Sequence, residues 1–166
     1  MTRFALAITA FLLSACATHA TEPAESAGAG AMKMHHEPHV MRHESAADFE
    51  TTLAQLKGAV EARGFKTFAV IDHAAGAASV DQPLRPTTLI VFGNPQGGTP
   101  VMQAEQLTGL ELPLKMLVME KPDGGVALVW RDMAHSFHEY GIDDHPAADK
   151  MSAALEAIAQ EAGQGD

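Results

Sequence analysis

The chain has 166 residues, of which 46% are hydrophobic and 19% are charged, and its formal net charge at pH 7 is −10. This length and composition are typical of one globular domain, and the acidic balance excludes a general nucleic-acid-binding surface. A single cysteine, Cys16, excludes an intrachain disulfide. Burial of apolar side chains must therefore stabilise the folded part.

The N-terminus has the features of a bacterial export signal. Arg3 gives a positive start, and the apolar run Phe4–Leu13 is too short to cross a bilayer as a helix. The residues that follow, Leu-Ser-Ala-Cys, resemble a lipobox that ends at Cys16. We predict that residues 1–15 are a signal peptide and that Cys16 is lipidated. Cleavage by ordinary signal peptidase is the alternative, because small residues also flank the cysteine.

The lipid would attach the protein to the cell envelope, facing the periplasm. Ala17 follows the cysteine in place of the aspartate that retains lipoproteins in the inner membrane of enteric bacteria, so the outer membrane is the expected destination. Ala17–Met32 is rich in Ala, Gly, Glu, Ser and Thr and has no apolar period. We therefore assign residues 16–37 to a flexible tether and residues 38–162 to the domain.

A segment rich in histidine and methionine joins tether to domain. Its donors are Met32, Met34, His35, His36, His39, Met41 and His43. Imidazole suits Cu(II), whereas a thioether selects Cu(I), so copper is the metal that this composition indicates. If His39–His43 is extended, then His39, Met41 and His43 point to one side. The alternative is a solvated linker with weak, non-selective metal affinity.

The first half of the domain predicts a helix and two strands. Ser45 and Asp48 approximate a capping box, which predicts a helix from Ser45 to a C-cap at Gly64. Phe65–Asp72 predicts a strand, and the Ala-rich residues His73–Val80 predict one or two helical turns. The apolar run Thr87–Phe92 predicts the next strand.

The second half predicts a hairpin and three helices. Pro100 suits the first turn of a short helix that ends near Leu107. Leu114–Glu120 and Val126–Arg131 predict two strands, and the turn residues Pro-Asp-Gly-Gly between them predict a hairpin. Two further helices are expected at residues 132–140 and 149–162.

Three stretches together resemble the family known as domain of unknown function 302 (DUF302). They contain IDHAAGA in Phe65–Ala78, LRPTTLIVFGNP and GTPVMQ in Leu84–Met102, and LPLKMLVME in Leu112–Glu120. The resemblance implies an α+β fold like that of the TATA-binding protein, with an antiparallel sheet of about five strands packed against helices. It implies no activity. The family-motif positions that could contact a ligand are His73, Asn94, Pro95 and Lys115.

These observations support three hypotheses. The first is a lipid-anchored, non-catalytic module that binds a small ligand or copper. The second is an enzyme, which requires His73, Asn94 and Lys115 to meet in one pocket. The third is a structural envelope module, for example a homodimer joined through a sheet edge. His135 and His138 share a helix face at a spacing that can hold a metal, but a structural or surface role is the expectation for them.

Overall fold

The structure, a computed structural model, describes residues 39–143 and 145–165. They belong to one compact unit, residues 37–166. The predicted signal peptide, Cys16, the tether and the donors Met32, Met34, His35 and His36 lie outside the described residues. No helix in the described part of the chain is both long enough and apolar enough to cross a membrane.

One antiparallel sheet forms the frame of the domain. Its strands are β1 (Val40–Ser45), β2 (Lys66–Asp72), β3 (Thr87–Gly93), β4 (Leu114–Glu120) and β5 (Val126–Arg131). Their spatial order is β1-β5-β4-β3-β2, with every neighbouring pair antiparallel. The predicted α+β class is confirmed. The hairpin β4–β5 also forms as predicted, and Gly124 has the positive φ of 83° that its turn needs.

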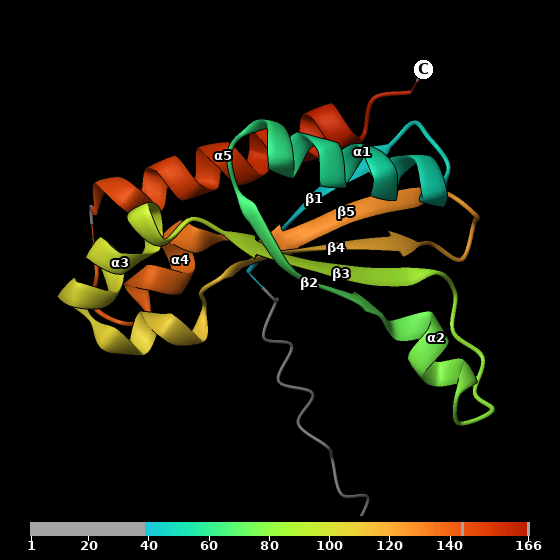
Figure 1. Cartoon of the computed structure of the whole chain (residues 1–166), viewed down its shortest axis with the longest axis horizontal. Helices are drawn as coiled ribbons and strands as arrows, with labels where there is room; N and C mark the ends of the chain where they lie inside the picture. Colours follow the sequence, from blue (N-terminus) through green and yellow to red (C-terminus); the bar gives the residue numbers. More distant parts are fainter. Residues whose placement is uncertain (1–38, 144, 166) are drawn as a thin grey trace, which may run out of the picture. The chain divides into compact units, whose positions relative to one another are not determined.

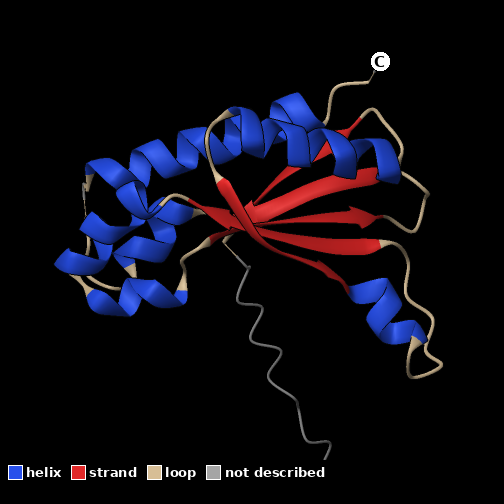
Figure 2. Ribbon diagram, in the orientation of Figure 1, coloured by secondary structure: helices blue, strands red, loops and turns tan. Residues whose placement is uncertain are grey.

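The helices gather on one face and at both ends of this sheet. They are α1 (Phe49–Ala62), α2 (His73–Ala78), α3 (Pro95–Ala104), the 3₁₀ helix η1 (Gln106–Leu110), α4 (Met133–His138) and α5 (Pro146–Ala162). Figure 1 shows α1 and α5 side by side over one face, α3 and α4 at one end, and α2 at the other. Figure 2 shows the same division between one helical layer and one sheet.

The core lies between the sheet and the pair α1 and α5. Alternate residues of the central strands point into it, since successive strand side chains face opposite sides. Ile90 of β3, Met116 of β4 and Leu128 of β5 are each 0% exposed. From the helices, Leu56 and Ile158 are equally buried against them. Arg63, at the C-terminal end of α1, forms an ion pair of 2.6 Å with Glu161 of α5.

The first helix begins later than the sequence predicts. Ser45 is the last residue of β1 and pairs with Val126, so its backbone belongs to the sheet. Asp48 is the N-cap instead, and its carboxylate accepts a hydrogen bond of 2.8 Å from the Thr51 amide. The Ser45 hydroxyl lies 2.7 Å from that of Thr52 and links the strand end to the helix.

Two other helices begin earlier than predicted. Helix α3 starts at Pro95, not Pro100, because the Asn94 side chain caps it by accepting a bond of 3.0 Å from the Gln96 amide. Helix α5 starts at Pro146, with His145 as its N-cap. Proline has a φ that suits the first helical turn and has no amide that needs a partner there. Leu107 lies in the separate turn η1.

Candidate functional site

A cavity of about 420 Å³ lies where α3 and α5 meet the ends of β2, β3 and β4. Its walls are mostly apolar. The lining residues are Phe65, Phe68, Gly93, Asn94, Pro95, Gly97, Gly98, Thr99, Met102, Leu112, Pro113, Leu114, Ala147, Lys150, Met151 and Ala154. The volume and the apolar character are those of a small-molecule binding pocket.

Small residues keep this pocket open. A β-carbon at Gly93 would lie 3.4 Å from both the Phe68 ring and the Pro113 side chain. A β-carbon at Gly98 would lie 3.4 Å from a methyl of Leu112. Ala147 and Ala154, seven residues apart, lie on the same side of α5 and complete that wall. Larger side chains at these positions would fill the space that a ligand needs.

Three polar residues interrupt the apolar lining. Asn94 and Thr99 come from α3 and its N-cap, and Lys150 comes from the first half of α5. Lys150 is exposed, so its ammonium can meet an anionic group at the mouth without losing much hydration. The described lining includes no His, Cys, Ser, Asp or Glu. These walls suit a ligand that is mainly apolar and has one polar end.

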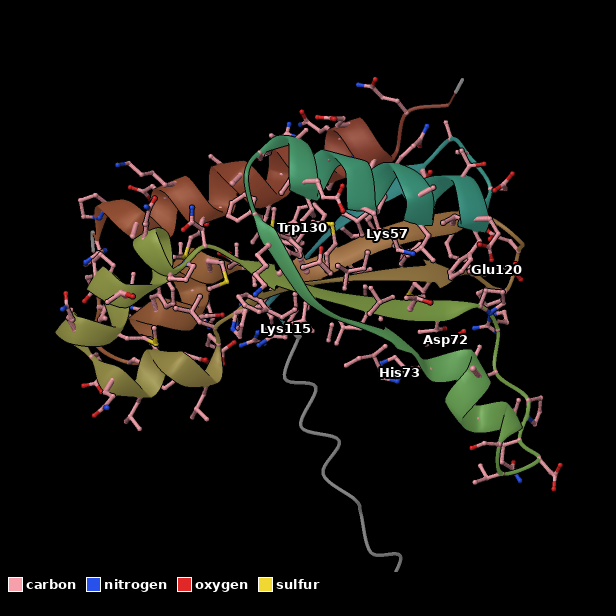
Figure 3. All side chains as sticks on the ribbon, viewed as in Figure 1. Lys57, Asp72, His73, Lys115, Glu120 and Trp130 are labelled. Atoms are coloured by element: carbon pink, nitrogen blue, oxygen red, sulfur yellow. The ribbon has the colours of Figure 1, made fainter. Side chains whose placement is uncertain are left out.

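The structure does not bring His73, Asn94 and Lys115 together in this pocket. Asn94 and Pro95 line it, but His73 and Lys115 do not. Figure 3 shows His73 at the start of α2 and Lys115 at the start of β4. The Asp72 carboxylate accepts from the Ala75 amide at 2.9 Å, so its observed role is to cap α2. The pocket that the enzyme hypothesis requires is therefore not formed by these three residues.

Lys115 has a local structural role. Its ammonium donates to the carbonyl oxygens of Glu111 at 3.0 Å and Leu110 at 3.4 Å. These carbonyls lie at the C-terminal end of η1, where helical oxygens lack partners within the helix. The family-motif lysine thus caps a 3₁₀ helix, and the segment that it fixes leads into Leu112 and Pro113 of the pocket wall.

Three donors of the His/Met segment, His39, Met41 and His43, lie within the described residues, and each contacts a different part of the domain. The His39 ring stacks on that of His135 in α4, with centroids 3.3 Å apart and planes inclined by 21°. Met41 instead lines a smaller cavity beside Trp130, and the His43 ring packs against Gly163 at the end of α5. A straight strand places His39 and His43 about 13 Å apart. The three donors therefore do not converge on one point.

His138 pairs with a nearby carboxylate. Its Nδ1 lies 2.6 Å from Oδ1 of Asp143. The pKa of His138 is raised above its ordinary 6.5. The largest cause is the hydrogen bond to Asp143, followed by the charge of Asp143 and then by the charge of Glu139. Because the pKa is raised in the folded state, the pair stabilises the fold fully below pH 6.5. This stabilisation is lost as the pH rises through the folded pKa.

We expect Asp143→Asn to lower the pKa of His138, since the variant removes both the charged acceptor and its field. An NMR titration of the imidazole Cε1–H resonance measures the midpoint. The variant should also lose the corresponding stability at acidic pH while keeping its stability above the folded pKa. An unchanged His138 midpoint in the variant would contradict the observed pairing.

Most residues of this pocket had no direct signal in the amino-acid pattern. Phe68, Met102 and Met151 come from three separate elements, and each fits an ordinary apolar stripe. The sequence contains two hints. One is the pair Gly97 and Gly98 in the predicted loop after Pro95, and the other is the spacing of Ala147, Met151 and Ala154. Neither hint separates a pocket wall from an ordinary core face, so only the fold identifies the site.

Comparison with known proteins identifies the family. The model of "Domain of unknown function DUF302" matches residues 41–160. A crystal structure of an uncharacterized conserved DUF302 protein from Bacillus stearothermophilus has the same fold, with a TM-score of 0.68 and 16% identity. The structural match covers 75% of this chain and 98% of the Bacillus stearothermophilus chain. The chain belongs to the DUF302 family, as its motifs predict.

Two curated relatives from Brucella are similar over part of their length. One is the fluoride-specific ion channel FluC 1 of Brucella suis biovar 1 (strain 1330), and the other is FluC 1 of Brucella abortus biovar 1 (strain 9-941). Each is 38% identical over 112 residues, which is 66% of this chain. The match covers 42% of the first relative and 40% of the second. This chain thus spans less than half of their length.

Proposed function

We propose that this DUF302 domain is a non-catalytic binding module for a small amphiphilic molecule with an apolar chain and an anionic end. The pocket of about 420 Å³ between α3, α5 and the sheet carries the proposal. Its apolar walls suit the chain, and Lys150 at its edge suits the anion. Fluoride transport is not part of the proposal, because the shared segment is only about two fifths of the FluC relatives.

The lining favours binding over catalysis. Amide, hydroxyl and ammonium groups are the polar groups of the described lining, and each can orient a ligand. General acid–base or nucleophilic chemistry needs a titrating or nucleophilic side chain within reach of the substrate. Lys150 is the titratable group among the described lining residues, and as an exposed ammonium it suits ion pairing.

The proposed location is the envelope. The leader, the lipobox and Ala17 support lipidation of Cys16 and attachment to the outer membrane with the domain facing the periplasm. In that setting the domain would meet amphiphiles that leave or enter a membrane. The apolar walls of the pocket fit molecules of that chemistry.

Copper binding is the second candidate function. The His/Met segment supplies nitrogen and sulfur donors, and the stack of His39 on His135 places one of its imidazoles beside another. This candidate involves a different part of the molecule from the pocket. Copper titration of the purified protein tests it, and the absence of binding would contradict it.

Calorimetric titration with straight-chain fatty acids tests the pocket. Each added methylene contributes about 0.8 kcal/mol when it is buried, so decanoate should bind roughly tenfold more tightly than octanoate. Decanol keeps the chain and lacks the charge, so it should bind more weakly than decanoate if Lys150 contacts the anion. An affinity that does not depend on chain length would overturn the proposal.

A further inference from the structure

A second, smaller cavity of about 220 Å³ lies where β1 and β5 meet α4 and α5. Three carboxylates line it, from Asp132 at the N-cap of α4 and from Asp149 and Glu156 in α5. Lysine, arginine and histidine are absent from its described lining, so the formal charge there is entirely negative. The larger pocket has the opposite character, because its described lining includes Lys150 and no carboxylate. The two sites therefore suit ligands of opposite charge.

The remaining lining of the smaller cavity is mostly apolar. Trp130 of β5 and Met41 of β1 are cross-strand partners, so their side chains lie on the same face of the sheet. Met133, the first residue of α4, completes this surface. Met41 is 45% exposed and Trp130 is 6% exposed, so the cavity opens beside the methionine. An aromatic ring attracts cations to its face and also packs well against methylene groups.

The three carboxylates have no cationic partner within the described part of the chain. None of the ion pairs there includes them. The Asp132 carboxylate accepts from backbone amides, and the Glu156 carboxylate accepts from the Gln160 side chain at 3.2 Å. Such neutral donors leave the negative charges uncompensated, and like charges in one cavity repel each other. A bound cation would relieve this repulsion.

A ligand with two separated charges matches the spacing of the acidic residues along α5. Asp149 and Glu156 are seven residues apart, which corresponds to about 10.5 Å along the helix axis. Ser152 lies between them on the same face of the helix and also lines the cavity. Its hydroxyl oxygen is buried and has no hydrogen-bond partner among the described groups. A buried hydroxyl without a partner is destabilising, and the N–H of an amine in the cavity would supply one.

We propose that this cavity binds an aliphatic diamine, with its methylene chain against Trp130 and its two ammonium groups beside the carboxylates of α5. The negative charge favours ammonium groups, and the apolar surface favours a methylene chain. The volume is smaller than the range of about 300–1,000 Å³ that is typical of sites for drug-sized molecules, so a compact diamine is the ligand that fits. The site is independent of the apolar pocket and of the copper candidate.

Titrations followed by tryptophan fluorescence test the site, because Trp130 is the one tryptophan of the chain. The probes are diaminopentane with terminal amines, aminopentane and pentanediol, which have the same chain and carry two, one and no positive charges. Diaminopentane should bind about tenfold more tightly than aminopentane, since a second charge-assisted hydrogen bond forms. Pentanediol should give no saturable change. Equal affinity for diaminopentane and aminopentane, or no saturable change with diaminopentane, would overturn the proposal.

Variants of the carboxylates show where the diamine binds. Asp149→Asn and Glu156→Gln should each weaken diaminopentane binding about tenfold, because each removes one charged partner. Glu50→Gln is the matched control. Glu50, like Asp149, is an acidic residue in the first turn of a helix, but it lies in α1, outside the cavity. This variant should bind diaminopentane as tightly as the wild-type protein does.

The variants also separate a built site from general attraction to an acidic chain. Equal weakening in all three variants would indicate general attraction, and wild-type affinity in both α5 variants would show that these carboxylates do not hold the ligand. Either result would overturn the site. Glu156 lies beyond the first turn of α5, so its variant keeps the test valid even if Asp149→Asn destabilises the start of the helix.

Discussion

Ala154→Phe is expected to weaken decanoate binding at least tenfold while leaving the domain folded. Ala154 lines the pocket from α5, and the new ring would occupy the volume that the ligand chain needs. The side chain enters an existing cavity, so the overpacking strain that usually follows such a substitution in a filled core should be small. Calorimetric titration gives the affinity, and thermal unfolding reports on the fold.

The neighbouring residue provides the matched control. Ala153 is exposed on the same helix, so Ala153→Phe adds the same ring to solvent. Decanoate affinity should remain at the wild-type value in this variant. Equal loss of affinity in the two variants, or no loss in either, would show that the ligand does not enter between α5 and α3.

Phe92→Ala is expected to lower the free energy of unfolding by about 3–5 kcal/mol. Phe92 is 0% exposed on β3, and its ring meets Phe65 edge to face at 5.7 Å. Phe65 is itself a pocket residue, so the cavity left by the substitution would adjoin the ligand site and loosen its wall. Urea denaturation measures the loss of stability.

Phe68 offers a comparison of the same side chain in a different setting. It lines the pocket but is 48% exposed, so Phe68→Ala should cost roughly 1 kcal/mol of stability. Its main effect should be weaker decanoate binding. A destabilisation by Phe92→Ala as small as that by Phe68→Ala would contradict the position of Phe92 in the core.

Local patterns predicted the strands and most helices correctly. The Pro-Asp-Gly-Gly turn predicts the β4–β5 hairpin because both strands and the turn are adjacent in the chain. The position of β1 beside β5 depends on contacts between distant residues, which periodicity does not encode. The predicted start of α1 at Ser45 was wrong, because the strand pairing of Ser45 with Val126 outweighed the preference of Ser45 to cap a helix.

The candidate site was predicted only in part. Asn94 and Pro95 do line the pocket, but their local roles are to cap and begin α3. The Lys115 ammonium donates a hydrogen bond to a carbonyl at the end of η1. The sequence pattern did not distinguish η1 from α3. The pocket and the meeting of His39 with His135 both join segments far apart in the chain. Such sites depend on tertiary packing, which residue spacing alone does not reveal.

The pocket is tested most directly by methyl NMR of the protein labelled at methionine, titrated with decanoate. Met102 and Met151 line the pocket, whereas Met41 and Met133 line the smaller cavity. We expect the methyl resonances of Met102 and Met151 to shift and saturate together, while those of Met41 and Met133 stay in place. Saturable shifts confined to Met41 and Met133, or no saturable shift at all, would contradict it.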